Sequence, residues 1–397
     1  MFPLRQLKRE DYTIAWLCAL PQSESLAAQW MLDEQHDPPP QHKTDMNEYQ
    51  YGSIKSHNIV ITCMPETLPG HVSATFLAAS LKRDFSNVAL HLFVGIGGGI
   101  PRPKTELPPR MHEEDVFLGD VVLGLPANGE DPAVVSYDLR RTHQKPDRAI
   151  VAKLGTFFRN AKQGGTHFHE HLRRLDRLHG FGHPGRGNDL LYEADFPCKH
   201  SKDYMDVQTM CGCGRERLVT RKEREPPGTQ LVFHRGTICS ANRFMADAET
   251  RDAMRTEYPT ARCFEMEAAG VIDTHALVIR GITDYSDSHS NRRWQNYAAG
   301  AAAALTREII VNMAPMESSG SSQIDRNSEH ARCFAYNSIS MSQDRFINRK
   351  GEVWEQMTVR GLSIYEIIYL ECAEGSRRVT SRFRYSLCRS LSLTEHL

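Results

Sequence analysis

The sequence predicts an α/β fold in which a largely parallel or mixed sheet is covered by helices. Six short apolar runs have the length and composition of strands that are buried on both faces. Longer segments with a helical spacing of apolar residues lie between several of them, and this alternation is typical of α/β domains. The expected strands cover 13–20, 58–64, 88–96, 120–125, 231–238 and 276–282, and the expected helices cover 23–33, 71–83, 148–160, 244–257, 266–275 and 294–312.

Size and composition indicate a globular protein. Of the 397 residues, 40% are hydrophobic and 24% are charged, which suffices for a sizeable core in one large or two smaller domains. The formal net charge of -1 gives no overall basic field, so nucleic acid is not an expected partner. Scattered cysteines and an amino terminus without an apolar core predict reduced thiols and a cytoplasmic location. The apolar runs are too short to cross a bilayer.

Two regions depart from the strand and helix pattern. Residues from about 161 to 230 are rich in His, Arg, Gly and Pro, which predicts a long surface insertion that is a candidate lid. Residues 315–397 lack the alternation of strand-like and helix-like segments and end in an Arg/Ser-rich sequence, which predicts a weakly ordered tail. The main domain is therefore expected to cover residues 12–314.

Polar or glycine-rich segments follow four of the expected strands. They are Glu24, the glycine run 95–99, the segment 240–244 and the segment 283–287. Ligands of open α/β sheets bind outside the carboxyl ends of the strands. We therefore expect these four segments to meet around one crevice.

The glycine run does not match the dinucleotide-binding fingerprint, which would require a glycine at the position of Ile100. Four glycines are also more than a tight turn needs. Gly97 and Gly98 are better explained as positions where backbone amides approach a sugar or an anion closely.

Two carboxylates, Glu265 and Glu267, flank Met266 and precede three small residues. Small residues are typical of a tightly packed segment, where a carboxylate is costly unless it has a partner. A bound ligand is one such partner, whereas two glutamates on a solvent-facing helix are the alternative.

Several motifs, taken in order, resemble the purine and uridine phosphorylase superfamily. They are CFEMEAAG, VGIGGG, LGDVV and VIRGITDYSDSH followed by WQNYAAGAAAAL, and they cover about residues 12–312. The resemblance is greatest to a eukaryotic branch related to methylthioadenosine/adenosylhomocysteine nucleosidases, whose insertion the segment 184–195 also resembles. It implies a three-layer α/β/α sandwich with a central mixed, partly barrel-like sheet, a homo-oligomer, a purine nucleoside or nucleotide as small-molecule partner, and no cofactor or metal.

The resemblance also implies roles for three carboxylates. Glu267 would accept hydrogen bonds from the ribose hydroxyls, which suits an ionised carboxylate, with Met266 against the sugar. Asp284 would donate a proton to N7 of a purine, which requires a raised pKa from burial or from a neighbour such as Asp287. Glu24 would orient or deprotonate the attacking water, although a glutamate at a helix start is also favoured by the helix dipole.

The same resemblance places Phe244 against the base, with Ser240 and Asn242 beside it. Packing in the core is the alternative explanation for this phenylalanine.

The nucleophile decides between hydrolysis and phosphorolysis. The family's phosphate-binding positions hold Phe93, Val94, Ile96 and Gly97 here, so no charged phosphate clamp is present there. Water is therefore the expected co-substrate. Phosphate remains the alternative, with Arg102 as a substitute cation.

Arginines of the insertion could meet a 5'-phosphate chain, although solvated surface charges are the simpler interpretation. This set comprises Arg186, Arg215, Arg217, Arg221 and Arg224, and related chains often carry another arginine where this one has Phe117.

Two further hypotheses remain open. Cys198, His200, Cys211 and Cys213 could bind zinc, although their spacing matches no familiar finger. The domain could also be a catalytically silent module that senses nucleosides or binds a partner.

Overall fold

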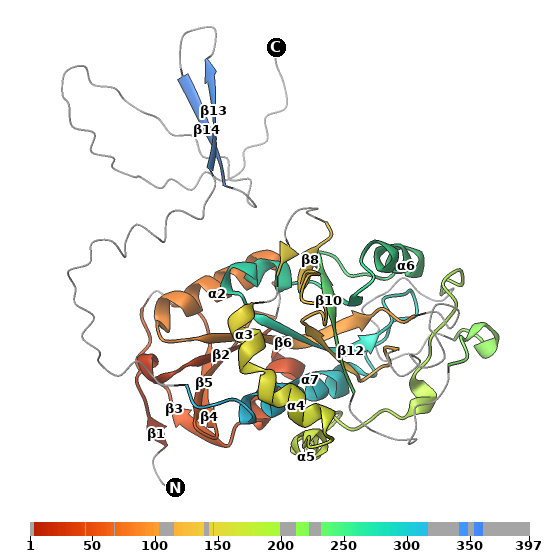
Figure 1. Ribbon diagram of the computed structural model, residues 1–397, viewed down its shortest axis with the longest axis horizontal. Coiled ribbons are helices and arrows are strands. Elements are labelled where there is room, and N and C mark those ends of the chain that lie inside the picture. The colour runs from red at the N-terminus through yellow and green to blue at the C-terminus, as the bar shows by residue number, and fades with distance from the viewer. Residues whose placement is uncertain are drawn as a thin grey trace. The chain divides into compact units, whose positions relative to one another are not determined.

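The computed structural model describes residues 4–43, 45–66, 68–102, 115–138, 143–145, 147–198, 212–221, 232–316, 341–347 and 353–359 (Figure 1). The chain divides into two compact units, Met1–Ser322 and Gln323–Leu397. In the described part of the second unit, β13 (Met341–Ile347) pairs antiparallel with β14 (Val353–Val359). The other residues of the predicted tail beyond Met316 lie outside the described residues, so its weak order stays a prediction.

A mixed twelve-stranded sheet organises the described part of the first unit, as the sequence predicts for an α/β fold. Its order is β1-β3-β4-β5-β2-β6-β12-β7-β10-β8-β9, with β11 paired to both β10 and β6. The strands are β1 (Arg5–Gln6), β2 (Ile14–Cys18), β3 (Glu34–Asp37), β4 (Tyr49–Ile54), β5 (His57–Cys63), β6 (Leu90–Gly99), β7 (Val121–Gly124), β8 (Val134–Ser136), β9 (His143–Gln144), β10 (Phe233–Ser240), β11 (Ala261–Glu265) and β12 (Leu277–Asp284). All six strands expected from the sequence are present.

Five of these strands close into a ring. β6 pairs with β12, β12 with β7, β7 with β10, β10 with β11, and β11 returns to β6. The pairings of β11 with β6 and of β12 with β7 are antiparallel, and the other three are parallel. The mixed, partly barrel-like sheet implied by the resemblance is therefore present.

Helices cover the sheet. They are α1 (Leu26–Trp30), α2 (His71–Asp84), α3 (Arg148–Lys153), α4 (Gly155–Lys162), α5 (Phe168–Arg173), α6 (Ala248–Glu257) and α7 (Gln295–Val311), with short helical turns η1 (Arg9–Asp11), η2 (Pro21–Ser25), η5 (Arg186–Asn188), η6 (Arg215–Arg217) and η7 (Ala268–Thr274). None of the described helices is long and apolar enough to span a bilayer.

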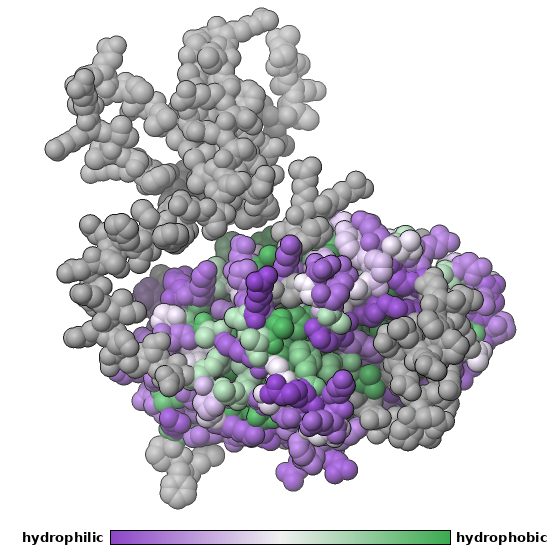
Figure 2. All heavy atoms as spheres, in the orientation of Figure 1, coloured by the Kyte–Doolittle hydropathy of each residue, from purple (hydrophilic) through white to green (hydrophobic). Residues whose placement is uncertain are grey.

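Alternate residues of β2 join two separate hydrophobic clusters. Ile14 and Trp16 belong to a cluster that contains α7 residues, whereas Ala15 and Leu17 belong to one that contains α2 residues. Side chains of a strand alternate between its faces, so the two clusters lie on opposite faces of the sheet. Figure 2 shows mostly hydrophilic residues on one face of the molecule, with hydrophobic residues gathered near its middle.

Small residues bring α7 against β12. A methyl group built on Gly281 would lie 1.9 Å from the carbonyl oxygen of Ala298, so only glycine permits this contact.

We expect Gly281→Ala to lower the free energy of unfolding by about 3 kcal/mol, the upper end for overpacked cores, because the backbone at Ala298 must move to make room. Chemical denaturation will measure the loss. Gly182→Ala is the matched control, since nothing lies within 4 Å of its added methyl, and an equal effect of both changes would contradict this packing argument.

The structure corrects three expected helices. The segment expected at 244–257 becomes helical only at Ala248, because Asp247 caps the helix by accepting from the Thr250 amide at 2.7 Å. The segment 148–160 forms two helices, α3 and α4, and 266–275 forms the 3-10 helix η7. These differences are local and leave the order of elements unchanged.

The insertion contains little regular structure in its described residues. Past α5 it holds η5, η6 and an isolated bridge between Tyr192 and Leu218. This agrees with the expectation of few strands. Residues 199–211 and 222–231 of the insertion lie outside the described residues.

Candidate functional site

The predicted site segments meet, and three of the four lie at the ends of parallel strands. β10 and β11 run opposite to β6 and β12, and β11 overlaps β6 only through Cys263 opposite Gly99 and Phe264 opposite Gly98. Because these strands overlap by their last residues, the carboxyl ends of oppositely directed strands come together. The expected shared carboxyl edge is thus correct for the segments at the ends of β2, β6 and β12, which are parallel to one another. The segment after β10 reaches them from the opposite direction.

Glu24 lies in the π-helical turn η2 directly after β2 and is buried. Its Oε2 accepts hydrogen bonds from the amides of Ala19 and Leu20 at 2.7 and 3.0 Å, and its Oε1 accepts from the amide of Ile96 at 2.9 Å. Burial raises the pKa of this carboxyl, while Arg280 and the three amides oppose the increase. Glu24 is therefore held rigidly beside the glycine-rich end of β6.

Arg280 is the cation at the centre of this site and is fully buried in β12. Its Nη2 donates to Glu265 Oε2 at 2.5 Å and lies 3.9 Å from Glu267 Oε2. A methyl group on Gly95 would lie 2.3 Å from Nη1 of Arg280 and 2.4 Å from Oε1 of Glu24, so Arg280 also approaches Glu24 closely. Arg280 thus hydrogen-bonds Glu265 and interacts electrostatically with Glu24 and Glu267.

Arg280 was not among the residues singled out in the sequence, although it carried a signal. A charged residue in the apolar run ALVIRGI is unusual, because arginine is almost never fully buried unless it is paired. Its partner carboxylates lie on distant segments, so only the fold reveals why it is tolerated.

Glu265 and Glu267 are both buried, which rules out the alternative of two solvent-facing glutamates. Glu265 Oε2 also accepts from the amides of Glu267 and Ala268, at 3.0 and 2.8 Å, and so has a structural role. Burial, followed by repulsion from Glu265, raises the pKa of Glu267 to about 8. The expectation of an ionised Glu267 therefore holds only above that pH in the ligand-free protein.

The glycines of β6 give space to side chains of the site. A methyl on Gly98 would lie 2.1 Å from Ser286 Oγ and 2.8 Å from Asp284 Oδ1, and one on Gly97 would lie 2.4 Å from the sulfur of Cys263. The run lies within the strand rather than in a turn before a helix, in agreement with the rejection of a dinucleotide-binding loop. Close packing of side chains explains these glycines without a ligand.

Asp284 ends β12 and is buried. Burial raises its pKa to about 6, with a smaller contribution from Asp287, while the Ser286 amide that donates to its Oδ1 at 2.8 Å opposes the increase. A carboxyl with this pKa is partly protonated near neutral pH. The raised pKa that the sequence argument required of a proton donor is present.

A small cavity of about 20 Å³ adjoins Asp284. It is lined by the loop after β12 and by insertion residues that include Asn188, Leu190 and Tyr192. The insertion therefore covers the acid, as expected of a candidate lid. A larger hollow of about 700 Å³ lies near Trp30 and Arg174 and contains none of the predicted site residues, so size alone is a poor guide to the site.

Ser240 and Asn242 bind the start of α2. Ser240 Oγ accepts from the amide of Ala269 at 3.0 Å and lies 3.0 Å from Nε2 of His71, and Asn242 Oδ1 accepts from the amide of His71 at 2.8 Å. His71, which the sequence argument overlooked, thus joins the site to α2. Ser240 and Asn242 already have structural partners in this state.

Phe244 is 46% exposed and Met266 is half-buried. The exposure of Phe244 rules out core packing as the explanation for this residue.

Most insertion arginines form ion pairs. Arg221 is buried, donates to Asp189 Oδ1 at 2.8 Å, hydrogen-bonds the hydroxyl of Tyr285, and lies 3.9 Å from the ring centre of Phe117. The interpretation of this residue as a solvated charge is therefore wrong. It fastens the insertion to the residue after Asp284.

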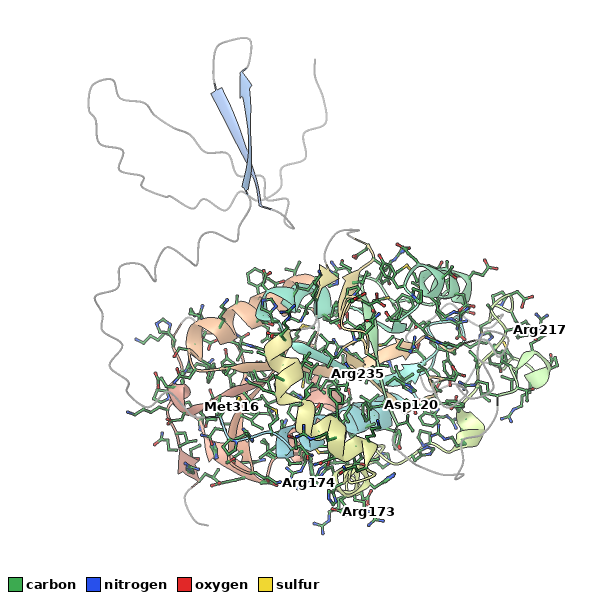
Figure 3. The ribbon with its side chains drawn as sticks, in the orientation of Figure 1. Asp120, Arg173, Arg174, Arg217, Arg235 and Met316 are labelled. Atoms are coloured by element: carbon green, nitrogen blue, oxygen red, sulfur yellow. The ribbon has the colours of Figure 1, made fainter. Side chains whose placement is uncertain are left out.

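Two other insertion arginines also bind carboxylates. Arg186 lies 3.3 Å from Asp189, and Arg217 pairs with Glu193 and Asp195 at the outer end of the insertion, far from Asp120 (Figure 3). These contacts argue against a ready phosphate-binding cluster. Arg224 lies outside the described residues.

Arg102 is occupied by protein groups as well. Its guanidinium donates to the carbonyl of Pro259 at 3.1 Å and its amide donates to Asp115 at 2.8 Å. This contact disfavours it as a substitute phosphate ligand.

Two of the four candidate zinc ligands, His200 and Cys211, lie outside the described residues. The other two, Cys198 and Cys213, lie together with His289, which was not predicted as a ligand.

Comparison with known proteins finds partial relatives, and no protein-family model matches the chain. A nucleotide-binding leucine-rich repeat (NLR)-like protein of Hyaloscypha variabilis is 33% identical over 326 residues, which are 78% of this chain but 30% of that protein. A 5'-methylthioadenosine/S-adenosylhomocysteine nucleosidase of Lysinibacillus sphaericus is 32% identical over 87 residues, 20% of this chain and 38% of that enzyme. The chain therefore spans well under half the length of these relatives.

Among solved structures, a futalosine hydrolase of Helicobacter pylori has 14% identity and a TM-score of 0.46, and covers 76% of this chain and 98% of its own. A 5'-methylthioadenosine/S-adenosylhomocysteine nucleosidase of Neisseria meningitidis has 17% identity and a TM-score of 0.43, and covers 75% and 98%.

Proposed function

We propose that this chain cleaves the N-glycosidic bond of purine nucleosides or nucleotides by hydrolysis, with the three-layer α/β/α architecture and homo-oligomeric state implied by the family resemblance. The observation that carries the proposal is a buried carboxyl, Asp284, whose pKa is about 6, at the end of the strand whose Arg280 interacts with Glu24 and Glu267. The partial relative named as a methylthioadenosine/adenosylhomocysteine nucleosidase supports the same chemistry.

The chemistry needs a proton donor at the base and acceptors at the sugar. Cleavage leaves an oxocarbenium-like sugar and a base that becomes anionic unless it is protonated. In the proposal Asp284 donates its proton to N7 of the purine, Glu267 accepts hydrogen bonds from the ribose hydroxyls, and Glu24 orients the attacking water. Water then adds to the sugar carbon as the bond to the purine breaks, and Glu24 takes up the proton that the water loses.

Water is favoured over phosphate by the charges around Arg280. Its Nη2 already donates to the Glu265 carboxylate, so the positive charge of this arginine is paired within the protein before any phosphate binds. Phosphorolysis is therefore the less favoured reaction.

The test of the proposal is product analysis. The purified full chain is mixed with adenosine, ATP and inosine, with and without inorganic phosphate, and base and sugar are separated by chromatography. Free base with free ribose or ribose 5-phosphates, independent of phosphate, is the expected result. Ribose 1-phosphate formed only with phosphate would show a phosphorylase.

A second candidate function is favoured by the NLR-like relative, which this chain matches over 30% of its length. In that case the domain senses nucleosides as part of a larger protein and does not cleave them. Nucleoside-dependent stabilisation in thermal denaturation without any base release would support this function over the first.

Substitution of Glu267 tests the proposed orientation of the substrate, in which the ribose hydroxyls face this residue. Above the Glu267 pKa of about 8, where this carboxylate is ionised, we expect Glu267→Gln to lower kcat/KM for adenosine by about 10- to 100-fold, because hydrogen bonds to a charged group are worth about 1.5–3 kcal/mol. The loss for 2'-deoxyadenosine should be smaller, since that substrate lacks one hydroxyl. Glu249→Gln, at an exposed position of α6, is the matched control. Equal losses for both substrates would contradict the assigned contact with the 2'-hydroxyl.

A further inference from the structure

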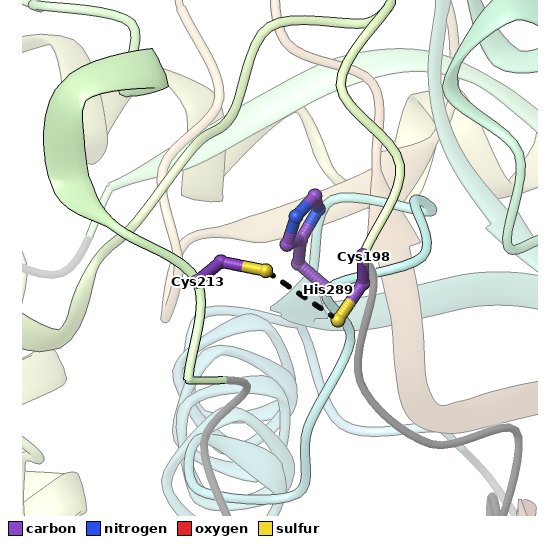
Figure 4. A group of neighbouring side chains, drawn as sticks. All are labelled: Cys198, Cys213 and His289. Carbon is purple, nitrogen blue, oxygen red and sulfur yellow. Dashed lines mark hydrogen bonds between the residues drawn. The ribbon is translucent and has the colours of Figure 1, made fainter.

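Two cysteines of the insertion and one histidine of the loop after β12 form a compact group (Figure 4). The ligand atoms of Cys198, Cys213 and His289 all lie within 4.8 Å of one another, and the two sulfurs are 3.7 Å apart. Two thiolates at about 2.3 Å from a tetrahedral zinc ion would be about 3.8 Å apart. The sulfur separation therefore fits one shared ion, whereas a disulfide needs about 2.05 Å.

His289 supplies an independent observation. It is buried, and neither of its ring nitrogens has a hydrogen-bond partner among the described residues. A buried imidazole without partners is costly, because its polar nitrogens lose their contacts with water. A metal ion would satisfy one nitrogen. Asp287 Oδ1 lies 3.8 Å from Nδ1 of this ring, and carboxylates near the ring are typical of metal-bound histidines.

Neighbouring contacts hold the three ligands in place without a metal. The ring of His289 stacks on Tyr192, with centroids 3.9 Å apart. The amide of Cys198 donates to Ser288 Oγ at 2.7 Å, and the hydroxyl of Tyr192 donates to the carbonyl of Cys213 at 3.4 Å. Each of the three residues is therefore held in position by a contact of its own, which is not expected of side chains that only happen to lie close together at the surface.

We propose that Cys198, Cys213 and His289 bind a zinc ion that fastens the insertion to the loop carrying Asp284. Two thiolates and one imidazole form a ligand set that zinc favours over hard cations such as Mg²⁺ and Ca²⁺. The described insertion has little regular backbone pairing, and a structural metal supplies stability where a local core is small. The site has no part in the proposed cleavage and stands or falls separately from it.

The first test measures metal in the full chain purified under reducing conditions. Elemental analysis is expected to find about one zinc ion per chain, and replacement by Co²⁺ should give the thiolate-to-cobalt charge-transfer absorption. Both measurements use the wild-type chain, so they do not depend on the folding of a variant. Absence of zinc uptake, cobalt binding without thiolate absorption, or a Cys198–Cys213 disulfide in the reduced chain would each overturn the proposal.

The second test assigns the ligands. Cys213→Ser and His289→Gln are each expected to weaken zinc affinity by more than about tenfold in competition with a chromophoric chelator, since even loss of an outer contact costs 10- to 100-fold. Cys63→Ser, in β5, and His179→Gln, at an exposed position, are the matched controls and should retain full zinc content. Unchanged affinity in both ligand variants would show that the metal binds elsewhere.

Discussion

Asp284→Asn is expected to reduce the rate of base release by about 10²- to 10⁴-fold, the range that a positioned general acid contributes. Asparagine keeps the size of the side chain and an oxygen that can accept from the Ser286 amide, but it has no proton to give. Single-turnover chromatography of adenosine measures the loss. Asp273→Asn, at an exposed position of η7, should retain wild-type rates. A loss below tenfold in the Asp284 variant would remove this residue from the mechanism.

The pH dependence of the wild-type chain follows from the same group and from Glu267. Burial raises the pKa of Asp284 to about 6, and the acid acts only when protonated. Because the ionised fraction of Glu267 increases up to its pKa of about 8, kcat/KM should change little between pH 6 and 8 and fall above about pH 8, by up to tenfold per unit. The descending limb should be absent from the residual activity of the Asp284→Asn chain. A rate that rises steadily from pH 6 to pH 8 would contradict a donor role.

The pH dependence of stability tests the raised pKa of Asp284 independently of catalysis. The folded pKa of about 6 exceeds the ordinary value of 3.8, so the folded state holds this proton more tightly than the unfolded state. The stabilising contribution is present below about pH 4 and is lost as pH rises through about 6, which costs about 3 kcal/mol at pH 8. Asp284→Asn should therefore be more resistant to denaturant than wild type at pH 8, and the difference should shrink towards pH 4.

Local sequence patterns predicted the strands and singled out a carboxylate-rich segment and a glycine-rich one, because such patterns depend only on neighbouring residues. They did not predict β11, whose five residues ARCFE include two charges, although all five are buried. Closure of the ring depends on β11 pairing with β6, a contact between distant segments. No periodicity within either strand encodes that contact.

The same distinction between local patterns and contacts of distant segments applies to the site residues. Glu24, Glu267 and Asp284 could be singled out because motifs mark them, whereas their electrostatic state depends on Arg280 and Glu265 and required the fold. The contact of His289 with Cys198 and Cys213 joins the insertion to a loop that follows β12. Spacing within the insertion alone therefore suggested a different set of ligands.

Arg280→Met is expected to lower the free energy of unfolding by about 3–5 kcal/mol, the cost of leaving a buried charge without its partner. Methionine fills much of the same volume and can still pack on Phe93, above which the guanidinium lies at 4.3 Å. The cost is therefore mainly electrostatic. Guanidinium denaturation measures it, and Arg177→Met, at an exposed position, is the matched control.

Two further measurements separate charge from packing at Arg280. The destabilisation should be greater at pH 8 than at pH 5, because the carboxylates that lose their cation can take up protons at low pH. Adding Glu265→Gln to Arg280→Met should recover part of the loss, since it removes the carboxylate left without its partner. If the single variant does not fold, Arg280→Lys keeps the positive charge and should lose less stability than Arg280→Met combined with Glu265→Gln. A pH-independent loss with no recovery in the double variant would mean that the arginine acts through packing, and that the three carboxylates do not depend on its charge.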